Sequence, residues 1–269
     1  MKYIFGTVLV LLLCAAAGSG LTLLIFMKKR TGRIRKILVS ILLSLILFLT
    51  AGFLYLRQYY PAEPAAESFL QSTDTVTVRK TSFGYYFDGS SAKTAVIFYP
   101  GGKVDEKAYA PMMYHLAEQG ADCFLVRMPF RMPIFGIGRA EQIMDLYEYP
   151  DWYLMGHSLG GTAAAEYVRK HTDKIRGLIM LASYPNHPVP DHIQFLSVYG
   201  DRDGCLNKEA YEKAKADWPT SGKESVIKGG NHAGFGYYGN QKGDGMLLIS
   251  KQEQQDAVIH ETLKLMQDQ

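Results

Sequence analysis

The hydrophobic and polar positions divide the chain into a short apolar part and a longer part of mixed character. Residues 3–27 and 37–56 are two apolar stretches without a single charged residue. Each stretch is long enough to cross a hydrocarbon layer of about 30 Å as an α-helix. The segment between them, residues 28–36, contains six Lys and Arg residues. This pattern predicts a two-helix transmembrane hairpin over residues 1–58.

The basic residues of the hairpin predict its orientation. Its outer flanks carry only Lys2 and Arg57, so most of the positive charge lies in the loop 28–36. Loops rich in Lys and Arg remain in the cytoplasm. The sequence therefore predicts a multi-pass protein of the cell membrane, anchored in the lipid bilayer by both helices. Everything that follows the hairpin is then extracytoplasmic.

A cleaved signal peptide is the alternative for the first apolar stretch, because "CAAAGSG" at 14–20 contains small residues that resemble a cleavage site. However, the apolar run continues through "LTLLIFM", well past the core of a signal peptide. Cleavage would also place the basic loop on the wrong side of the membrane. Both points favour the uncleaved hairpin.

After the hairpin the pattern changes to alternating strands and helices. Residues 59–73, which include "YYPAEPAAESF", predict a short, stiff spacer. From residue 74 to residue 269, buried apolar segments alternate with amphipathic ones. Strands are predicted at 75–80, 83–89, 94–102, 122–129, 152–158, 175–183, 193–200 and 224–230, and helices at 106–120, 138–148, 160–171 and from about Ser250 onward.

The alternation predicts an α/β domain whose sheet is mostly parallel and covered by helices on both faces. The first two strands should form a hairpin. At the start of the last helix, "SKQE" has the form of a capping box. Only "SYPNHPVPDH" separates "GLIMLA" from "IQFLSVYG" in the two strands concerned, which leaves no room for an inserted lid.

The distribution of charged residues argues against one class of binding partner, nucleic acid. The formal net charge of the chain is +3, but residues 1–60 hold eight Lys and Arg and no acid. The remainder has 21 basic against 26 acidic residues. An acidic domain argues against nucleic acid as a partner.

The most informative segment is "GHSLG" at 156–160, which matches the pattern G-x-S-x-G. A predicted strand precedes it and a helix rich in small residues follows it, which is the context that a nucleophilic serine at a sharp strand-to-helix turn requires. Gly156 and Gly160 are needed there because side chains would clash. The alternative is a glycine-rich turn in which Ser158 only caps the helix.

A serine hydroxyl needs an imidazole to accept its proton and a carboxylate to orient that imidazole. "SVYGDRDG" supplies Asp201 and Asp203, and "IKGGNHAGFG" supplies His232, each just after a predicted strand. The order of serine, acid and histidine along the chain is the one that this type of turn demands. His187, Asp191 and His192 lie close together, but no further ligand cluster accompanies them, so no metal site is predicted.

The segments "YPGGKVDEKAYAPMMYHLAEQG", "GHSLGG", "YGDRDG" and "GGNHAGFGYYGNQKGDG" resemble the α/β-hydrolase superfamily. They are most similar to the bacterial alpha/beta hydrolase fold-5 family, which is related to dienelactone-hydrolase-like proteins. The resemblance implies an α/β-hydrolase fold with Ser158 as nucleophile, Asp203 as acid and His232 as base. Asp203 is preferred over Asp201 because such proteins usually place the acid three residues after the glycine, here Gly200. Dienelactone hydrolases use a cysteine nucleophile, so the serine indicates a different substrate.

Such an enzyme also needs an oxyanion hole made of two backbone N–H groups. One is expected from Leu159, directly after the nucleophile. The other is expected from the loop "YPGGKVD", with Gly102 as first choice and Lys103 as second. Many relatives have His-Gly where this chain has Pro100 and Gly101. The alternative interpretation of this loop is a plain tight turn.

Together these features predict a membrane-anchored serine hydrolase that acts on a small or lipid-like carboxylic ester through an acyl-enzyme, with no metal or organic cofactor. The same residues would also support transfer of the acyl group to another acceptor. A catalytically silent domain that binds a lipid or a protein is the alternative from another class. The apolar loop 128–138 and the aromatic segment 235–241 are expected to border an open active site, although Phe130 and Phe135 could instead cover the sheet edge.

Overall fold

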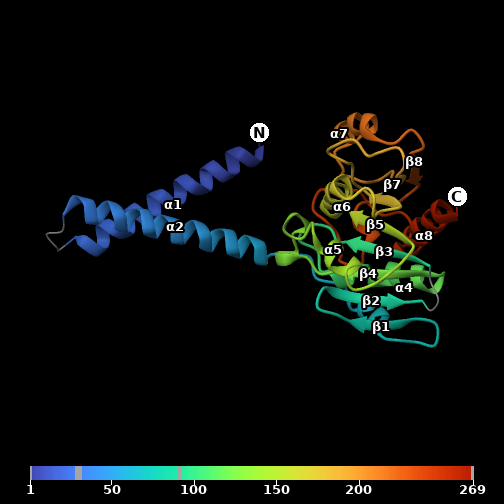
Figure 1. Ribbon diagram of the computed structural model, residues 1–269. Helices are drawn as coiled ribbons and strands as arrows, with labels where there is room; N and C mark the ends of the chain where they lie inside the picture. Colours follow the sequence, from blue (N-terminus) through green and yellow to red (C-terminus); the bar gives the residue numbers. More distant parts are fainter. Residues whose placement is uncertain (1, 28–31, 90–92, 268–269) are drawn as a thin grey trace. The chain divides into compact units, whose positions relative to one another are not determined.

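The computed structural model describes residues 2–27, 32–89 and 93–267 (Figure 1). The chain divides into two compact units, residues 1–58 and residues 59–269. The first unit consists of α1 (Lys2–Phe26) and α2 (Arg33–Arg57). Helix α2 begins inside the segment 28–36 that the sequence assigns to the loop, because Arg and Lys are good helix formers. Residues 28–31 of that loop lie outside the described part.

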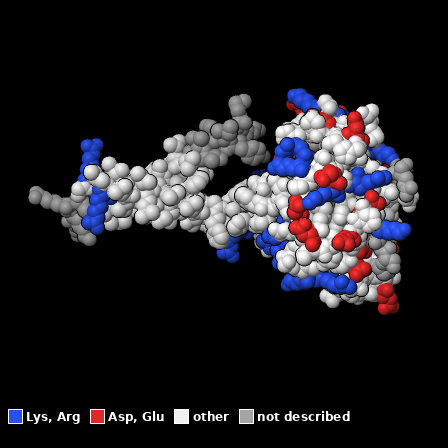
Figure 2. Space-filling view, in the orientation of Figure 1, with Lys and Arg blue, Asp and Glu red and all other residues white. Residues whose placement is uncertain are grey.

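The two helices pack on each other through small polar residues. A Cβ atom at Gly18 would lie 2.7 Å from the backbone nitrogen of Ser44, so only glycine allows this approach. The hydroxyls of Ser19 and Ser40 lie 3.0 Å apart. Windows of 18 residues in α1 and 25 residues in α2 are long and apolar enough to cross a membrane, and they are 17% and 0% buried. Figure 2 shows no acidic side chain on their described surface, since residues 1–60 contain no Asp or Glu.

The second unit begins at Tyr59, so the segment 59–73 is packed against the domain and is not an extended spacer. The backbone N–H of Tyr60 donates to the carbonyl of Lys103 at 2.7 Å, and its carbonyl accepts from the N–H of Asp105 at 2.9 Å. The segment continues in a short helix, α3 (Pro64–Glu67), and a 3-10 turn, η1 (Ser68–Leu70). Burial of Ala66 in α3 explains why an alanine-rich segment adheres to the domain.

The core of the second unit is an eight-stranded sheet in the order β1-β2-β4-β3-β5-β6-β7-β8. The pairs β1–β2 and β2–β4 are antiparallel and the other pairs are parallel, which confirms the predicted hairpin and the mostly parallel sheet. The strands are β1 (Thr77–Lys80), β2 (Gly84–Asp88), β3 (Thr94–Tyr99), β4 (Ala121–Val126), β5 (Asp151–His157), β6 (Gly177–Leu181), β7 (Gln194–Gly200) and β8 (Lys223–Ile227).

Helices cover both faces of this sheet, as Figure 1 shows. They are η2 (Glu106–Tyr109), α4 (Ala110–Glu118), η3 (Pro129–Arg131), η4 (Pro133–Phe135), α5 (Arg139–Met144), α6 (Leu159–Lys170), α7 (Lys208–Ala214), η5 (Lys215–Asp217), η6 (Ala233–Phe235) and α8 (Lys251–Gln267). The sequence pattern missed α7.

Alternate residues of each strand face opposite hydrophobic clusters, since successive side chains in a strand point to opposite faces. In β3, Phe98 belongs to the cluster that contains Met112 of α4, whereas Ile97 belongs to the cluster that contains Ala164 of α6. The loop 182–193 between β6 and β7 contains no helix or strand, which confirms that no lid is inserted there. The capping box of α8 is also confirmed, because the hydroxyl of Ser250 accepts from the N–H of Glu253 at 3.1 Å.

Candidate active site

Ser158 lies in a strained turn between β5 and α6. Its backbone angles are φ 53° and ψ −124°, a conformation that costs a non-glycine residue about 1–3 kcal/mol. A Cβ atom at Gly156 would lie 2.5 Å from the carbonyl of Gly160, and one at Gly160 would lie 2.1 Å from the carbonyl oxygen of Tyr99. Both glycines are therefore required for the turn. The Ser158 side chain makes no capping hydrogen bond, which argues against a purely structural role.

His232 and Asp203 form a buried pair. The Nδ1–H of His232 donates to Oδ2 of Asp203 at 2.8 Å, and the two side chains are 3% and 0% exposed. The other carboxylate oxygen, Oδ1, accepts from the N–H groups of Cys205 at 2.8 Å and Leu206 at 2.7 Å. These bonds fix the carboxylate, and the carboxylate in turn fixes the tautomer of the imidazole, leaving its Nε2 free to act as a base.

The fold brings this pair to the turn that holds Ser158. The ring centroid of His232 lies 4.6 Å from that of His157, the residue directly before the serine. Asp201, the competing acid, is exposed, and its Oδ1 accepts from the N–H of Gly229 at 2.7 Å. Asp201 therefore stabilises the turn after β8, and it is Asp203 that contacts the histidine.

Asp244, which the sequence analysis did not single out, ties the two loops of this pair together. Its Oδ1 accepts from the N–H groups of His232 at 3.2 Å and Gly204 at 3.1 Å, and its Oδ2 accepts from the N–H of Ala233 at 2.8 Å. Because Asp244 bonds to backbone rather than to a reacting side chain, no catalytic motif reveals it. The carboxylate positions the histidine loop against the acid loop.

The two residues expected to supply the oxyanion hole lie against each other. A Cβ atom at Gly102 would approach the Leu159 side chain to 3.0 Å. Among the described residues, neither backbone N–H has a hydrogen-bond partner. The second choice, Lys103, is different, because its N–H donates to the carbonyl of Arg131 at 2.7 Å. That bond removes Lys103 as a donor and leaves Gly102 with Leu159.

Tyr109 and His157 hold Gly101, the residue before Gly102, in place. The N–H of Gly101 donates to the Tyr109 hydroxyl at 3.1 Å, and that hydroxyl lies 2.8 Å from Nδ1 of His157. Since a phenol has one proton, the hydroxyl that accepts from Gly101 donates to His157. Burial holds the pKa of His157 well below its usual range, so this imidazole is neutral and accepts that bond. No sequence motif pointed to Tyr109, because only the fold brings its hydroxyl to His157.

The expected borders of the site differ from each other. Phe130 and Phe135, in the loop after β4, are 58% and 56% exposed, so they do not cover the sheet edge. Phe235 and Tyr238, in the aromatic segment after the histidine, are instead buried. Phe235 packs against the ring of His157, with centroids 5.4 Å apart. The second segment therefore packs beside the residue before Ser158, whereas the position of the first loop at the border of the site stays a prediction.

Three side chains of the metal-ligating type lie close together near the histidine. The ligand atoms of Asp203, Cys205 and Asp244 lie within 4.8 Å of one another. Burial raises the pKa of the Cys205 thiol to about 11, with smaller contributions from both carboxylates, so it would be a poor thiolate ligand. Within the described ranges, His187 and His192 contact separate partners, Glu166 and the carbonyl of Thr172, and form no ligand group.

Comparison with known proteins agrees with the α/β fold described above. Residues 95–256 match the model of the alpha/beta hydrolase family. Similar solved structures include alpha/beta hydrolase domain-containing protein 10 from mouse, with 12% identity and a TM-score of 0.50, over 71% of this chain and 98% of that one. Dienelactone hydrolase from Anabaena variabilis has 12% identity and a TM-score of 0.54, over 71% and 97%.

An alpha/beta hydrolase from a Penicillium species has 10% identity and a TM-score of 0.51, over 71% and 96% of the two chains. No curated protein matches the sequence. At these identities the solved structures establish the fold, while the activity has to be argued from the site.

Proposed function

The chain belongs to the alpha/beta hydrolase family, and from this premise we propose that it is a serine hydrolase that cleaves carboxylic esters at a membrane. The observation that carries the proposal is the buried Asp203–His232 pair beside the strained turn of Ser158. The proposal is supported by the position of this pair, because His232 packs against His157, the residue directly before Ser158. A glycine-rich structural turn would require neither the strain nor the pair.

The mechanism follows from these contacts. The Ser158 hydroxyl attacks the ester carbonyl while His232 Nε2 accepts its proton, because the other ring nitrogen is held by Asp203. The carbonyl oxygen becomes negative in the tetrahedral intermediate and is stabilised by the N–H groups of Leu159 and Gly102. His232 then protonates the leaving alcohol, and an acyl group remains on the serine. Water, deprotonated by His232, releases the acid in the same way.

Membrane anchoring through α1 and α2 is the second part of the proposal. Both helices meet the length and composition requirement for a span, and the described window of α2 buries none of its residues. Close helix packing at Gly18 and a hydroxyl pair between Ser19 and Ser40 are typical of helices that associate in lipid. With the basic segment 28–36 in the cytoplasm, the hydrolase unit lies outside it.

A fluorophosphonate label together with p-nitrophenyl butyrate tests the activity. The wild-type protein should be labelled on one serine and should hydrolyse the ester. Ser158→Ala should abolish labelling and reduce kcat by a factor of about 10³ or more, whereas the control Ser225→Ala should leave both unchanged. An unlabelled, inactive wild type would instead support a silent binding domain. Labelling with acyl transfer to an added alcohol, in place of hydrolysis, would support an acyltransferase.

A further inference from the structure

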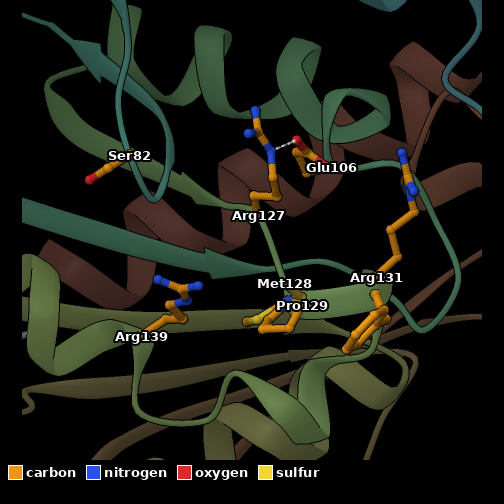
Figure 3. A pocket seen from close by; sticks show the side chains of 8 residues that line it. Ser82, Glu106, Arg127, Met128, Pro129, Arg131 and Arg139 are labelled. Atoms are coloured by element: carbon orange, nitrogen blue, oxygen red, sulfur yellow. Dashed lines mark hydrogen bonds and ion pairs between the residues drawn. The ribbon is translucent and has the colours of Figure 1, made fainter.

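A pocket lies at the carboxyl end of β4. It has a volume of about 280 Å³ and is lined by Arg127, Arg131 and Arg139, together with Ser82, Glu106 and Phe130 (Figure 3). We propose that this pocket binds an anionic group, a carboxylate or a phosphate, carried by the ester that Ser158 cleaves. The inference rests on the proposed hydrolase function and names the class of its substrate.

The charges that line the pocket do not cancel. Arg127 pairs with Glu106 at 2.7 Å, as the dashed line in Figure 3 shows. Arg131 pairs with Asp105 at 3.4 Å. Arg139 has no carboxylate partner among the described residues, and its hydrogen bond goes to the neutral amide of Gln142 at 2.8 Å. One guanidinium charge in the pocket is therefore uncompensated, and a ligand carboxylate or phosphate supplies the partner that the protein does not.

Two of the arginines are held in place before any ligand arrives. The carboxylate that pairs with Arg127 belongs to Glu106, whose side chain is only 7% exposed. The guanidinium of Arg131 stacks on the ring of Tyr59, with its carbon 3.6 Å from the ring centroid. Side chains that are already ordered lose less conformational entropy on binding. The pocket is thus a preformed cationic surface in which the charge of Arg139 alone, among the described residues that line it, has no carboxylate partner.

The position of the pocket fits a substrate group rather than an unrelated ligand. The carbonyl of Arg131 accepts from the N–H of Lys103, so the pocket loop is bonded to the loop that carries Gly102. Strand β4 is separated from β5 by β3 alone, and strands in a sheet are about 4.8 Å apart, which places the end of β4 roughly 10 Å from that of β5. A substrate of ordinary size spans that distance.

Phe130 adds an apolar rim to the same pocket. Its side chain is 58% exposed, and its ring lies 6.2 Å from that of Phe135, which is exposed to a similar extent. An exposed aromatic pair next to an uncompensated arginine favours a ligand with an apolar segment and a negative group. The substrate class is therefore an amphiphilic ester that bears a carboxylate or a phosphate.

The test compares matched esters with and without the charge. Mono-p-nitrophenyl suberate against p-nitrophenyl octanoate places a carboxylate on the acyl side, and butyryl glycerol phosphate against monobutyrin places a phosphate on the alcohol side. The wild type should prefer the charged member of one pair. Arg139→Gln should lower kcat/KM for that charged ester by about 10- to 100-fold and leave its neutral partner unchanged.

Arg79→Gln is the matched control, because Arg79 is an exposed arginine on β1 outside this pocket. It should change neither pair. The inference is overturned if the wild type prefers no charged ester, or if Arg139→Gln lowers the charged and neutral rates equally.

Failure of the proposed function would have a different signature, namely that no ester of either pair is cleaved. Calorimetry with suberate and glycerol phosphate then measures the pocket alone. Binding that Arg139→Gln weakens would support the anion site, and binding that is absent or unaffected by the substitution would refute it.

Discussion

Replacing Asp203 by Asn is the sharpest perturbation of the candidate site, because it changes one atom and a charge at nearly constant shape. The amide oxygen can still accept from the N–H groups of Cys205 and Leu206, which now contact Oδ1 at 2.8 and 2.7 Å. The amide nitrogen then takes the position of Oδ2, which lies 2.8 Å from Nδ1 of His232. Two N–H groups would face each other there, so the imidazole has to shift its proton to Nε2.

The expected loss of activity follows from this change of tautomer. An imidazole protonated at Nε2 cannot accept the proton of Ser158, and the comparable substitution in other serine hydrolases lowers kcat by about 10⁴. That factor corresponds to roughly 5.5 kcal/mol of activation free energy. The free energy of unfolding should fall by only about 1–2 kcal/mol, the difference between a charge-assisted and a neutral hydrogen bond.

The control is Asp201→Asn, two residues away. Asp201 is exposed and accepts from the N–H of Gly229, a bond that an amide oxygen retains, so kcat should stay at the wild-type value. The assay is kcat on p-nitrophenyl butyrate, with thermal unfolding to verify the fold of both variants. A large loss in Asp201→Asn with an active Asp203→Asn would refute the acid assignment. Full activity in both variants would refute the triad.

Four further outcomes are expected. Tyr109→Phe removes the acceptor that holds the oxyanion loop and should lower kcat about fivefold at unchanged KM, since one hydrogen bond contributes about 1 kcal/mol; a changed KM alone would contradict this role. Burial depresses the pKa of His157, so below about pH 6.5 the unfolded state binds a proton that the folded state does not. The free energy of unfolding should therefore decline as the pH falls below about 6.5. In urea titrations, His157→Gln should reduce this pH dependence. Gly160→Ala should prevent a stable fold, measured as loss of the thermal transition, since its Cβ would meet the Tyr99 carbonyl. Protease added to intact spheroplasts should digest the hydrolase unit if the segment 28–36 is cytoplasmic, and protection until lysis would refute that topology.

The sequence by itself determined the features that depend on neighbouring residues. Apolar periodicity predicted the strands and the two long helices, and three positions of "GHSLG" predicted the turn at Ser158, because its sterics involve only residues close in the chain. The capping box at Ser250 is local in the same way. The prediction of an extended spacer at 59–73 was wrong for the opposite reason, because Tyr60 bonds to Lys103 and Asp105, more than forty positions away in the chain.

Tertiary structure decided which groups meet across loops. From the residues alone both aspartates of "YGDRDG" stayed candidates, and only the folded turn shows that Asp203 contacts His232. Gly102 was distinguished from Lys103 as oxyanion-hole candidate by the hydrogen bond from the Lys103 N–H to the carbonyl of Arg131. The contacts of Asp244 and Tyr109 became visible only in the folded structure. Hydrogen bonds of this kind join residues at separate strand ends, and their partners are fixed by strand order and loop path, which no local periodicity encodes.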